Sequence, residues 1–130
     1  MHSFFKIPGS SVRKIDNSIV ESVDIYPTLL ELIGIDTPSG LDGESFASLL
    51  KSEESQMGNV AYSYFKQGIS MRTDRYRLTK YIRAAEPTIE LYDHQSDPLE
   101  SINIATDNPQ IVAELMPLLE KGNTGLYDKK

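Results

Sequence analysis

Residues 60–93 follow a side-chain period of two over four short segments, and this period is typical of β-strands. The segments are residues 60–65, 69–73, 76–82 and 88–93. The loops between them are shorter than the crossover of about a dozen residues that parallel neighbours require. We therefore predict an antiparallel four-stranded sheet in which consecutive strands lie side by side.

A helix is predicted after the sheet. Residues 107–109 (Asp-Asn-Pro) supply a cap followed by proline, which suits the first helical position. The apolar positions that follow form one stripe able to cover a face of the sheet: Ile111, Val112, Leu115, Leu118 and Leu119. Pro117 lies inside this pattern and is expected to kink or end the helix near Met116. Residues from Gly122 onward are expected to form a frayed tail.

A helical arm is predicted ahead of the sheet. Residues 24–33 have apolar positions at helical spacing, with Asp24 as the N-cap and Gly34 as the residue that ends the helix. A short helix is expected at residues 44–50, and residues 4–7 are expected to form a short strand. The predicted fold is α+β: a four-stranded antiparallel sheet with a C-terminal helix on one face, preceded by a helical N-terminal arm.

The chain leaves the last predicted strand through a pinned turn. Pro98 has a fixed φ and no N–H, and Asp97 can accept a hydrogen bond from the backbone just beyond it. Ile102 and Ile104 are expected to anchor the chain after the turn. His94 lies in the same loop and has neighbouring carboxylates. A general base also needs a pocket, and we interpret His94 as an exposed loop histidine without a function.

The composition excludes several kinds of partner. Nineteen acidic and thirteen basic residues give a formal net charge of −6, which disfavours nucleic acids and anionic membranes. The absence of cysteine excludes disulfides and thiolate zinc sites. No apolar run approaches the roughly 20 residues that span a bilayer. The densest basic cluster is interpreted as a solvated strand face with neighbouring acids: Arg72, Arg75, Arg77, Lys80 and Arg83.

Several segments resemble a known family. Residues 90–93 (ELYD), 97–100 (DPLE) and 103–105 (NIA) resemble the "ELYD…DPxE…NLA" signature near the C-terminus of sulfatases. Residues 23–30 (VDIYPTLL) and 71–77 (MRTDRYR) agree in order and spacing. The resemblance is closest to the iduronate-2-sulfatase-like branch and implies the C-terminal subdomain of an alkaline-phosphatase-like α/β fold.

The resemblance implies a division of the chain and of the enzyme. Residues 1–58 would be the end of the large sulfatase domain, residues 59–122 the C-terminal sheet-and-helix subdomain, and residues 123–130 a tail. The full enzyme would hydrolyse sulfate esters of a carbohydrate with calcium and a formylglycine. Both would belong to an upstream catalytic domain, so no catalytic or metal-binding residue is assigned to this chain. Family members are usually exported, and an orphan strand at residues 4–7 would favour self-association.

The candidate substrate contact lies in residues 62–67. This segment resembles the "YSQYPR" segment that borders the substrate cleft of iduronate-2-sulfatase-like enzymes, with departures at Tyr64, Lys66 and Gln67. A sulfated sugar requires a cation and a stacking aromatic ring, which Lys66 and either Tyr64 or Phe65 can supply. The alternative interpretation is aromatic strand packing beside a solvated lysine.

Two other functions are compatible with the sequence. One is a free-standing, non-catalytic binding module on the same scaffold, which predicts a closed surface and a monomer. The other is a phosphodiesterase or phosphonate hydrolase of the same superfamily, which only the nucleophile region could distinguish from a sulfatase.

Overall fold

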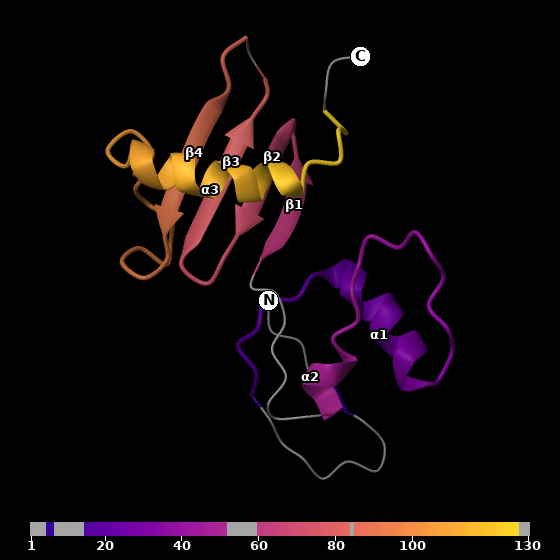
Figure 1. Ribbon diagram of the computed structural model, residues 1–130. Helices are drawn as coiled ribbons and strands as arrows, with labels where there is room; N and C mark the ends of the chain where they lie inside the picture. The colour runs from indigo at the N-terminus through magenta and orange to yellow at the C-terminus, as the bar shows by residue number, and fades with distance from the viewer. Residues whose placement is uncertain (1–4, 7–14, 52–59, 84, 128–130) are drawn as a thin grey trace. The chain divides into compact units, whose positions relative to one another are not determined.

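The computed structural model describes residues 5–6, 15–51, 60–83 and 85–127 (Figure 1). The chain divides into two compact units, Met1–Gly58 and Asn59–Lys130. Each unit has its own elements and its own buried side chains.

The second unit contains the predicted sheet. Its strands are β1 (Ala61–Phe65), β2 (Gly68–Arg72), β3 (Tyr76–Tyr81) and β4 (Thr88–Asp93). Their order in the sheet is β1-β2-β3-β4, and every neighbouring pair is antiparallel. The prediction of four antiparallel strands with consecutive neighbours is confirmed, and the strand ends differ from the predicted ones by a residue at most.

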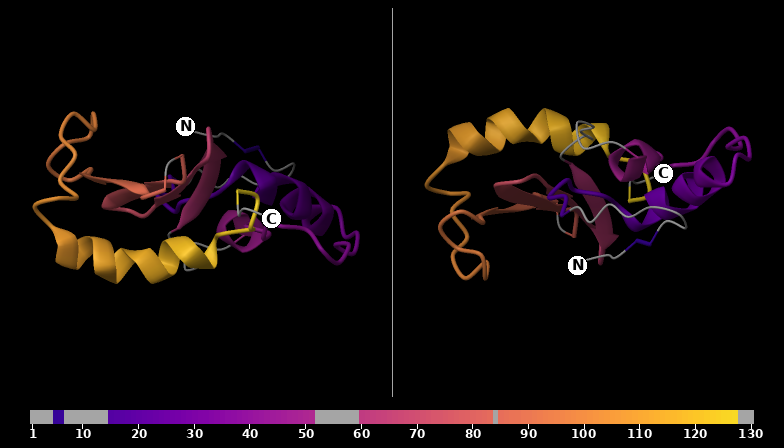
Figure 2. Two further views of the ribbon diagram at one scale, coloured as in Figure 1. Left: turned by 90° about the horizontal axis from the view of Figure 1, so that it is seen from above. Right: turned by 90° about the horizontal axis from the view of Figure 1, so that it is seen from below.

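Helix α3 (Pro109–Lys121) lies along one face of this sheet (Figure 2). The alternation of side chains brings the apolar residues of the strands to that face, where they meet the stripe of the helix. The fully buried cluster is Ile69, Met71, Leu78, Leu91 and Leu119. Asn108 is the N-cap and Pro109 the first helical residue, so both predicted features of the helix start are present.

The end of α3 differs from the prediction. The helix continues through Pro117 to Lys121, so of the two predicted outcomes, a kink or an end near Met116, the end is wrong. The proline removes one N–H from the helix. Beyond it, Leu119 is fully buried, and the Tyr62 hydroxyl donates to the carbonyl of Leu118 at 2.9 Å. These contacts hold the last turn in place despite the missing hydrogen bond.

The segment after α3 is not frayed as far as the structure describes it. The Tyr64 hydroxyl donates to the carbonyl of Gly122 and accepts from the N–H of Thr124 at 2.7 Å. The ring of Tyr127 lies 5.9 Å from that of Tyr64, measured between centroids. Residues 122–127 are therefore fixed to β1 by one tyrosine.

The first unit is built on the 3₁₀ turn η1 (Ser22–Asp24), α1 (Ile25–Leu32) and α2 (Ala47–Lys51). The predicted N-cap of α1, Asp24, is confirmed, although its side chain does not cap the helix. The carboxylate accepts instead from the N–H groups of Glu21 at 2.7 Å and Glu44 at 2.8 Å. This buried aspartate thus joins the start of α1 to the chain that leads into α2.

The end of α1 is a Schellman motif. Gly34 has φ of +74°, its N–H donates to Glu31, and the N–H of Ile35 donates to Leu30. The second predicted helix is shorter than expected, because it begins at Ala47 rather than at residue 44. Of the strand predicted at residues 4–7, only Phe5 and Lys6 lie within the described residues, and neither is in a strand.

The core predicts the effect of one pair of leucine substitutions. Leu91 is fully buried under α3, whereas the side chain of Leu99 is 87% exposed in the loop after β4. Leu91→Ala should lower the free energy of unfolding by about 2–5 kcal/mol, because it leaves a cavity among packed side chains. Leu99→Ala should change it by no more than about 0.5 kcal/mol. Urea unfolding followed by circular dichroism measures both, and equal effects would contradict the assigned core.

Candidate functional site

One end of the sheet is closed by an arginine–carboxylate pair. Arg75, in the turn between β2 and β3, donates from Nη2 to Asp93 Oδ2 at 2.7 Å and from Nε to both carboxylate oxygens at 3.1 Å. Asp93 ends β4 and is 8% exposed. The Arg75 guanidinium lowers the pKa of the Asp93 carboxyl, and the N–H of Gln95 adds to this effect at 3.0 Å. A carboxylate held in this way supports the turn and is unsuited to accept a proton.

A second group at this end involves Glu100, which has φ of +56°. Its carboxylate pairs with the Arg77 guanidinium through one oxygen and lies 2.6 Å from His94 Nε2 through the other. The side chain of His94 is only 19% exposed, so the interpretation of an exposed loop histidine is wrong. Glu100, the partner of His94, is six residues further along the chain. Its left-handed backbone conformation turns the chain back towards the end of β4.

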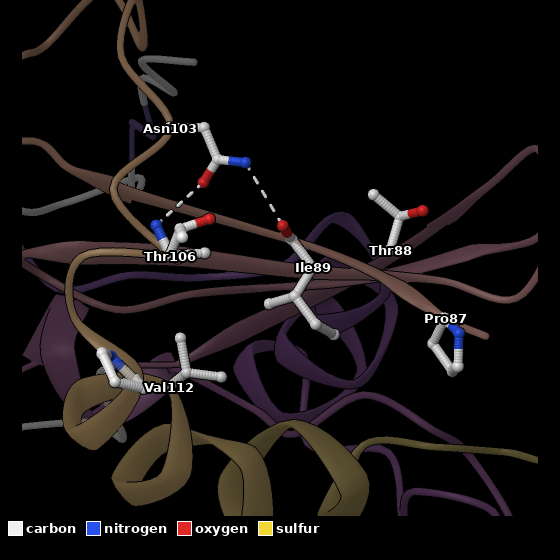
Figure 3. Close-up of a pocket in the computed structure, with 8 residues that line it drawn as sticks. Pro87, Thr88, Ile89, Asn103, Thr106 and Val112 are labelled. Atoms are coloured by element: carbon white, nitrogen blue, oxygen red, sulfur yellow. Dashed lines mark hydrogen bonds between the residues drawn. The ribbon is translucent and has the colours of Figure 1, made fainter.

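The turn after β4 is held by two polar side chains. Asp97 Oδ2 accepts from the N–H of Ile102 at 2.9 Å, and this hydrogen bond lowers the pKa of the Asp97 carboxyl. Asn103 Oδ1 accepts from the N–H of Leu91. Asn103 Nδ2 donates to the carbonyl of Ile89 (Figure 3). The Asn103 amide thus pairs with the outer edge of β4 as a neighbouring strand would.

The two isoleucines expected to anchor this segment behave differently. Ile104 packs against the core, and its N–H donates to the carbonyl of Leu91 at 2.9 Å. Ile102 is 65% exposed, so its prediction as an anchor is wrong. The physical reason is that the N–H of Ile102 is held by Asp97, which leaves its side chain directed to solvent.

These contacts give the ELYD…DPLE…NIA residues a structural role, because they hold the turn and the loop after β4 to the sheet. The carboxylates of Asp93, Asp97 and Glu100 each accept from a guanidinium or a backbone N–H. In the part of the chain that the structure describes, no group of three or more His, Asp or Glu side chains could hold a metal ion. The basic cluster is also partly neutralised, as predicted, because Arg75, Arg77 and Lys80 pair with acids.

A depression of about 550 Å³ lies between the start of β4 and the start of α3 (Figure 3). It is lined by Pro87, Thr88, Ile89, Asn103, Ala105, Thr106, Pro109 and Val112. None of these side chains is charged. A binding site for a sulfate ester needs a cation, so this depression does not suit such a ligand.

The candidate contact residues lie at the other end of the sheet, around the β1–β2 hairpin. Lys66 and Gln67 form its two-residue loop with φ of 46° and 58°, which is the backbone of a type I′ turn. Phe65 is 66% exposed, and Lys66 Nζ lies 5.1 Å from the centroid of its ring. Phe65 and Lys66 are therefore brought together on an exposed tip.

Tyr64, the third candidate, lies on the opposite side of β1. Alternation places Tyr64 with Tyr62 on the face that α3 covers, while Phe65 lies on the other face. The hydroxyl of Tyr64 is occupied by Gly122 and Thr124. The structure thus separates Tyr64 from the Phe65–Lys66 pair.

Sequence reasoning missed two residues beside this tip. The Arg83 guanidinium lies 4.1 Å from the centroid of the Tyr81 ring, and Arg83 Nε donates to the carbonyl of Lys66 at 2.7 Å. The sequence feature that indicates this arrangement is Gly68, which pairs with Tyr81 in the sheet. A Cβ at Gly68 would lie 2.6 Å from the Tyr81 ring, so the glycine makes room for it.

A family model described as N-sulphoglucosamine sulphohydrolase, C-terminal, matches residues 4–125. The chain belongs to this sulfatase family. The four-stranded sheet with its C-terminal helix is accordingly the C-terminal part of an alkaline-phosphatase-like sulfatase fold, as its structural neighbours also have.

Individual sulfatases agree with this assignment. A sulfatase of Formosa agariphila is 34% identical over 105 residues, which cover 80% of this chain and 20% of the relative. Arylsulfatase K of Mus musculus is 29% identical over 123 residues, covering 83% of this chain and 22% of the relative. The chain thus spans about a fifth of the length of these sulfatases.

This chain is also similar to a solved structure. It was determined in complex with its substrate D-glucosamine-2-N,6-O-disulfate, and it superposes with a TM-score of 0.66 at 28% identity. The match covers 75% of this chain and 22% of that one. The likeness therefore extends to a protein whose own substrate is D-glucosamine-2-N,6-O-disulfate.

The Arg75–Asp93 pair predicts a pH dependence of stability. Because the pKa of Asp93 is lowered in the folded state, its stabilising effect is complete above the unfolded value of about 3.9 and is lost as the pH falls through the folded pKa. Asp93→Asn should be less stable than the wild type at pH 7 and should lose less stability on acidification.

Urea midpoints at pH 7 and at about pH 3 test this prediction. Asp107→Asn is the control, since Asp107 is an exposed carboxylate of the same unit. If both variants keep the wild-type pH profile, Asp93 does not act through its charge.

Proposed function

We propose that this chain is the C-terminal part of an enzyme that hydrolyses sulfate esters of a carbohydrate. The observation that carries the proposal is the family match from residue 4 to residue 125, together with relatives that are sulfatases over the same region. Within the family, we assign the chain to the iduronate-2-sulfatase-like branch, on the resemblance of residues 62–67 to the YSQYPR segment. We further propose that the enzyme is exported, as sulfatases usually are.

The catalytic chemistry would be supplied by an upstream domain. In sulfatases the catalytic centre uses a formylglycine and a calcium ion that several oxygen ligands bind. The described residues offer no cluster for such an ion, and their carboxylates at the end of the sheet are engaged with arginines and N–H groups. This chain would therefore shape and support the catalytic centre.

The outer face of α1 provides a surface for that upstream domain. Pro27 and Thr28 are buried, yet Ile25, Tyr26 and Leu29 on the same helix are 37%, 54% and 49% exposed. Apolar side chains on an exposed face of a helix, beside a face that is already buried, are typical of a helix that packs against a further partner. Ile33, directly after the helix, is 67% exposed and extends this apolar face. Residues 1–58 would accordingly be the end of the large domain.

The chain is expected to meet the substrate at the hairpin tip. Phe65 offers an exposed ring and Lys66 a cation beside it, whereas Tyr64 holds the strand to the segment after α3. The type I′ turn at Lys66–Gln67 fixes the backbone of this tip, because a two-residue hairpin loop holds both of its residues at positive φ.

Among the residues that the structure describes, none of the helices has the length and apolar character needed to cross a bilayer.

A chimera tests the proposed activity. The C-terminal region of the Formosa agariphila sulfatase is replaced by this chain, and hydrolysis of an aryl sulfate is measured with calcium present. We expect turnover within about tenfold of the parent, because the framework pairs would support the same catalytic domain. The chain alone should give no turnover above buffer.

Two outcomes would contradict this proposal. One is aryl sulfate turnover by the isolated chain. The other is a folded chimera that gives no turnover of the aryl sulfate above buffer, because the chain would then not complete a sulfatase catalytic domain. Lys66→Gln in the chimera should spare the aryl sulfate, which lacks a sugar, and should raise KM for a sulfated disaccharide.

The exposed face of α1 predicts the behaviour of the isolated chain. We expect a dimer or larger species in gel filtration, through this face and the segment around Phe5, because an uncovered apolar surface of this kind associates. Leu29→Lys should shift the chain towards a monomer. Ser48→Lys, which adds the same charge at an exposed polar position of α2, is the control. A wild-type monomer would favour the free-standing binding module.

A further inference from the structure

We infer that Arg83 and Lys66 bind an anionic group of the sugar substrate other than the sulfate ester that is cleaved. The two cations would act with the rings of Tyr81 and Phe65 as a specificity site for sugars that carry at least two anionic groups. This inference rests on the proposed sulfatase function and adds to it a second cation, a second ring and a requirement on the substrate.

The sheet leaves two exposed cations at its hairpin end, because Arg72, which also has no carboxylate partner among the described residues, donates to the carbonyls of Thr73 and Tyr76. Arg75, Arg77 and Lys80 each pair with a carboxylate. Lys66 and Arg83 pair with no carboxylate among the described residues, and both are exposed. In a chain of net charge −6, two cations without carboxylate partners at one end of a sheet form a local positive site.

Two hydrogen bonds to the carbonyls of the hairpin loop hold Arg83 beside Lys66. The N–H of Ile82 donates to the carbonyl of Gln67 at 2.7 Å, which joins the β3–β4 loop to the hairpin loop. Arg83 Nε donates to the carbonyl of Lys66 at the same distance. Arg83 Nε makes this contact, and its two Nη atoms have no acceptor among the described residues. They present the fork that binds sulfate or carboxylate through two hydrogen bonds.

The aromatic rings indicate a sugar ligand. Phe65 and Tyr81 both pair with Gly68 across the sheet and so lie on the same face, opposite α3. Gly68 has no side chain between them, and the Tyr81 ring lies over its backbone. Each ring has a cation over it, at 5.1 Å for Lys66 and 4.1 Å for Arg83. The exposed Phe65 ring beside these cations suits the C–H face and the anionic substituents of a sulfated saccharide, and the Tyr81 ring holds the Arg83 guanidinium in place.

The test is a binding titration of the full 130-residue chain. A disulfated heparin disaccharide is added to ¹⁵N-labelled protein, and amide shifts are followed by NMR. We expect the shifts to centre on Lys66, Gln67, Ile82 and Arg83. Arg83→Gln should weaken binding at least about tenfold, because a charged hydrogen-bonded contact is lost. Lys121→Gln, which removes another exposed cation without a carboxylate partner among the described residues, should leave the affinity unchanged.

Three results would overturn the inference. The first is equal affinity of the wild type and Arg83→Gln for the disulfated disaccharide, and the second is a set of amide shifts centred on other residues. The third is a wild-type affinity for the monosulfated disaccharide, or for inorganic sulfate, that equals the affinity for the disulfated disaccharide. Unchanged amide shifts of the core strands in each variant show that the fold is kept. Failure here leaves the proposed sulfatase activity standing, because the chimera measures that activity with an aryl sulfate that has no second anion.

Discussion

The bidentate pair between Arg75 and Asp93 is the interaction on which the second unit depends. It joins the turn before β3 to the last residue of β4, and these two points are eighteen residues apart in the chain. The same aspartate orders the backbone beyond it, since its carboxylate and carbonyl accept from the N–H groups of Gln95 and Asp97. One buried carboxylate therefore fixes both the register of two strands and the direction in which the chain leaves the sheet.

The rest of the framework extends this arrangement. Glu100 lies where its carboxylate can pair with Arg77 of β3, and Asn103 satisfies the outer edge of β4. The loop after β4 is thereby held to the sheet by side chains rather than by a further strand. The sulfatase-like residues of the loop therefore have a structural role, and no catalytic role is needed to account for them. The chemistry of contact with a sugar is proposed for the opposite end of the sheet, where two cations have no carboxylate partner among the described residues.

The elements of the fold could be predicted because their signals are local. Period-two alternation marked the four strands, and Asn108–Pro109 marked the start of α3. The failures arose where a distant contact decided the outcome. Pro117 stays inside α3 because Leu119 is buried and Tyr62 holds the carbonyl of Leu118. His94 is covered because Glu100 returns to it through a left-handed residue, which sequence spacing does not show.

The candidate site could be predicted only where its residues are neighbours in the sequence. Phe65 and Lys66 are adjacent in sequence, so their proximity needed no fold. Arg83 reaches them only through the hairpin and the β3–β4 loop, whose pairing depends on the register of three strands.

A double-mutant cycle between Arg77 and Glu100 tests most directly whether the signature residues are framework. The free energy of unfolding is measured for Arg77→Met, Glu100→Gln and the double variant. The account predicts a coupling energy above about 1 kcal/mol, because the two groups are partly buried and joined across the sheet. A coupling energy indistinguishable from zero would contradict it, and the signature residues would then need another explanation.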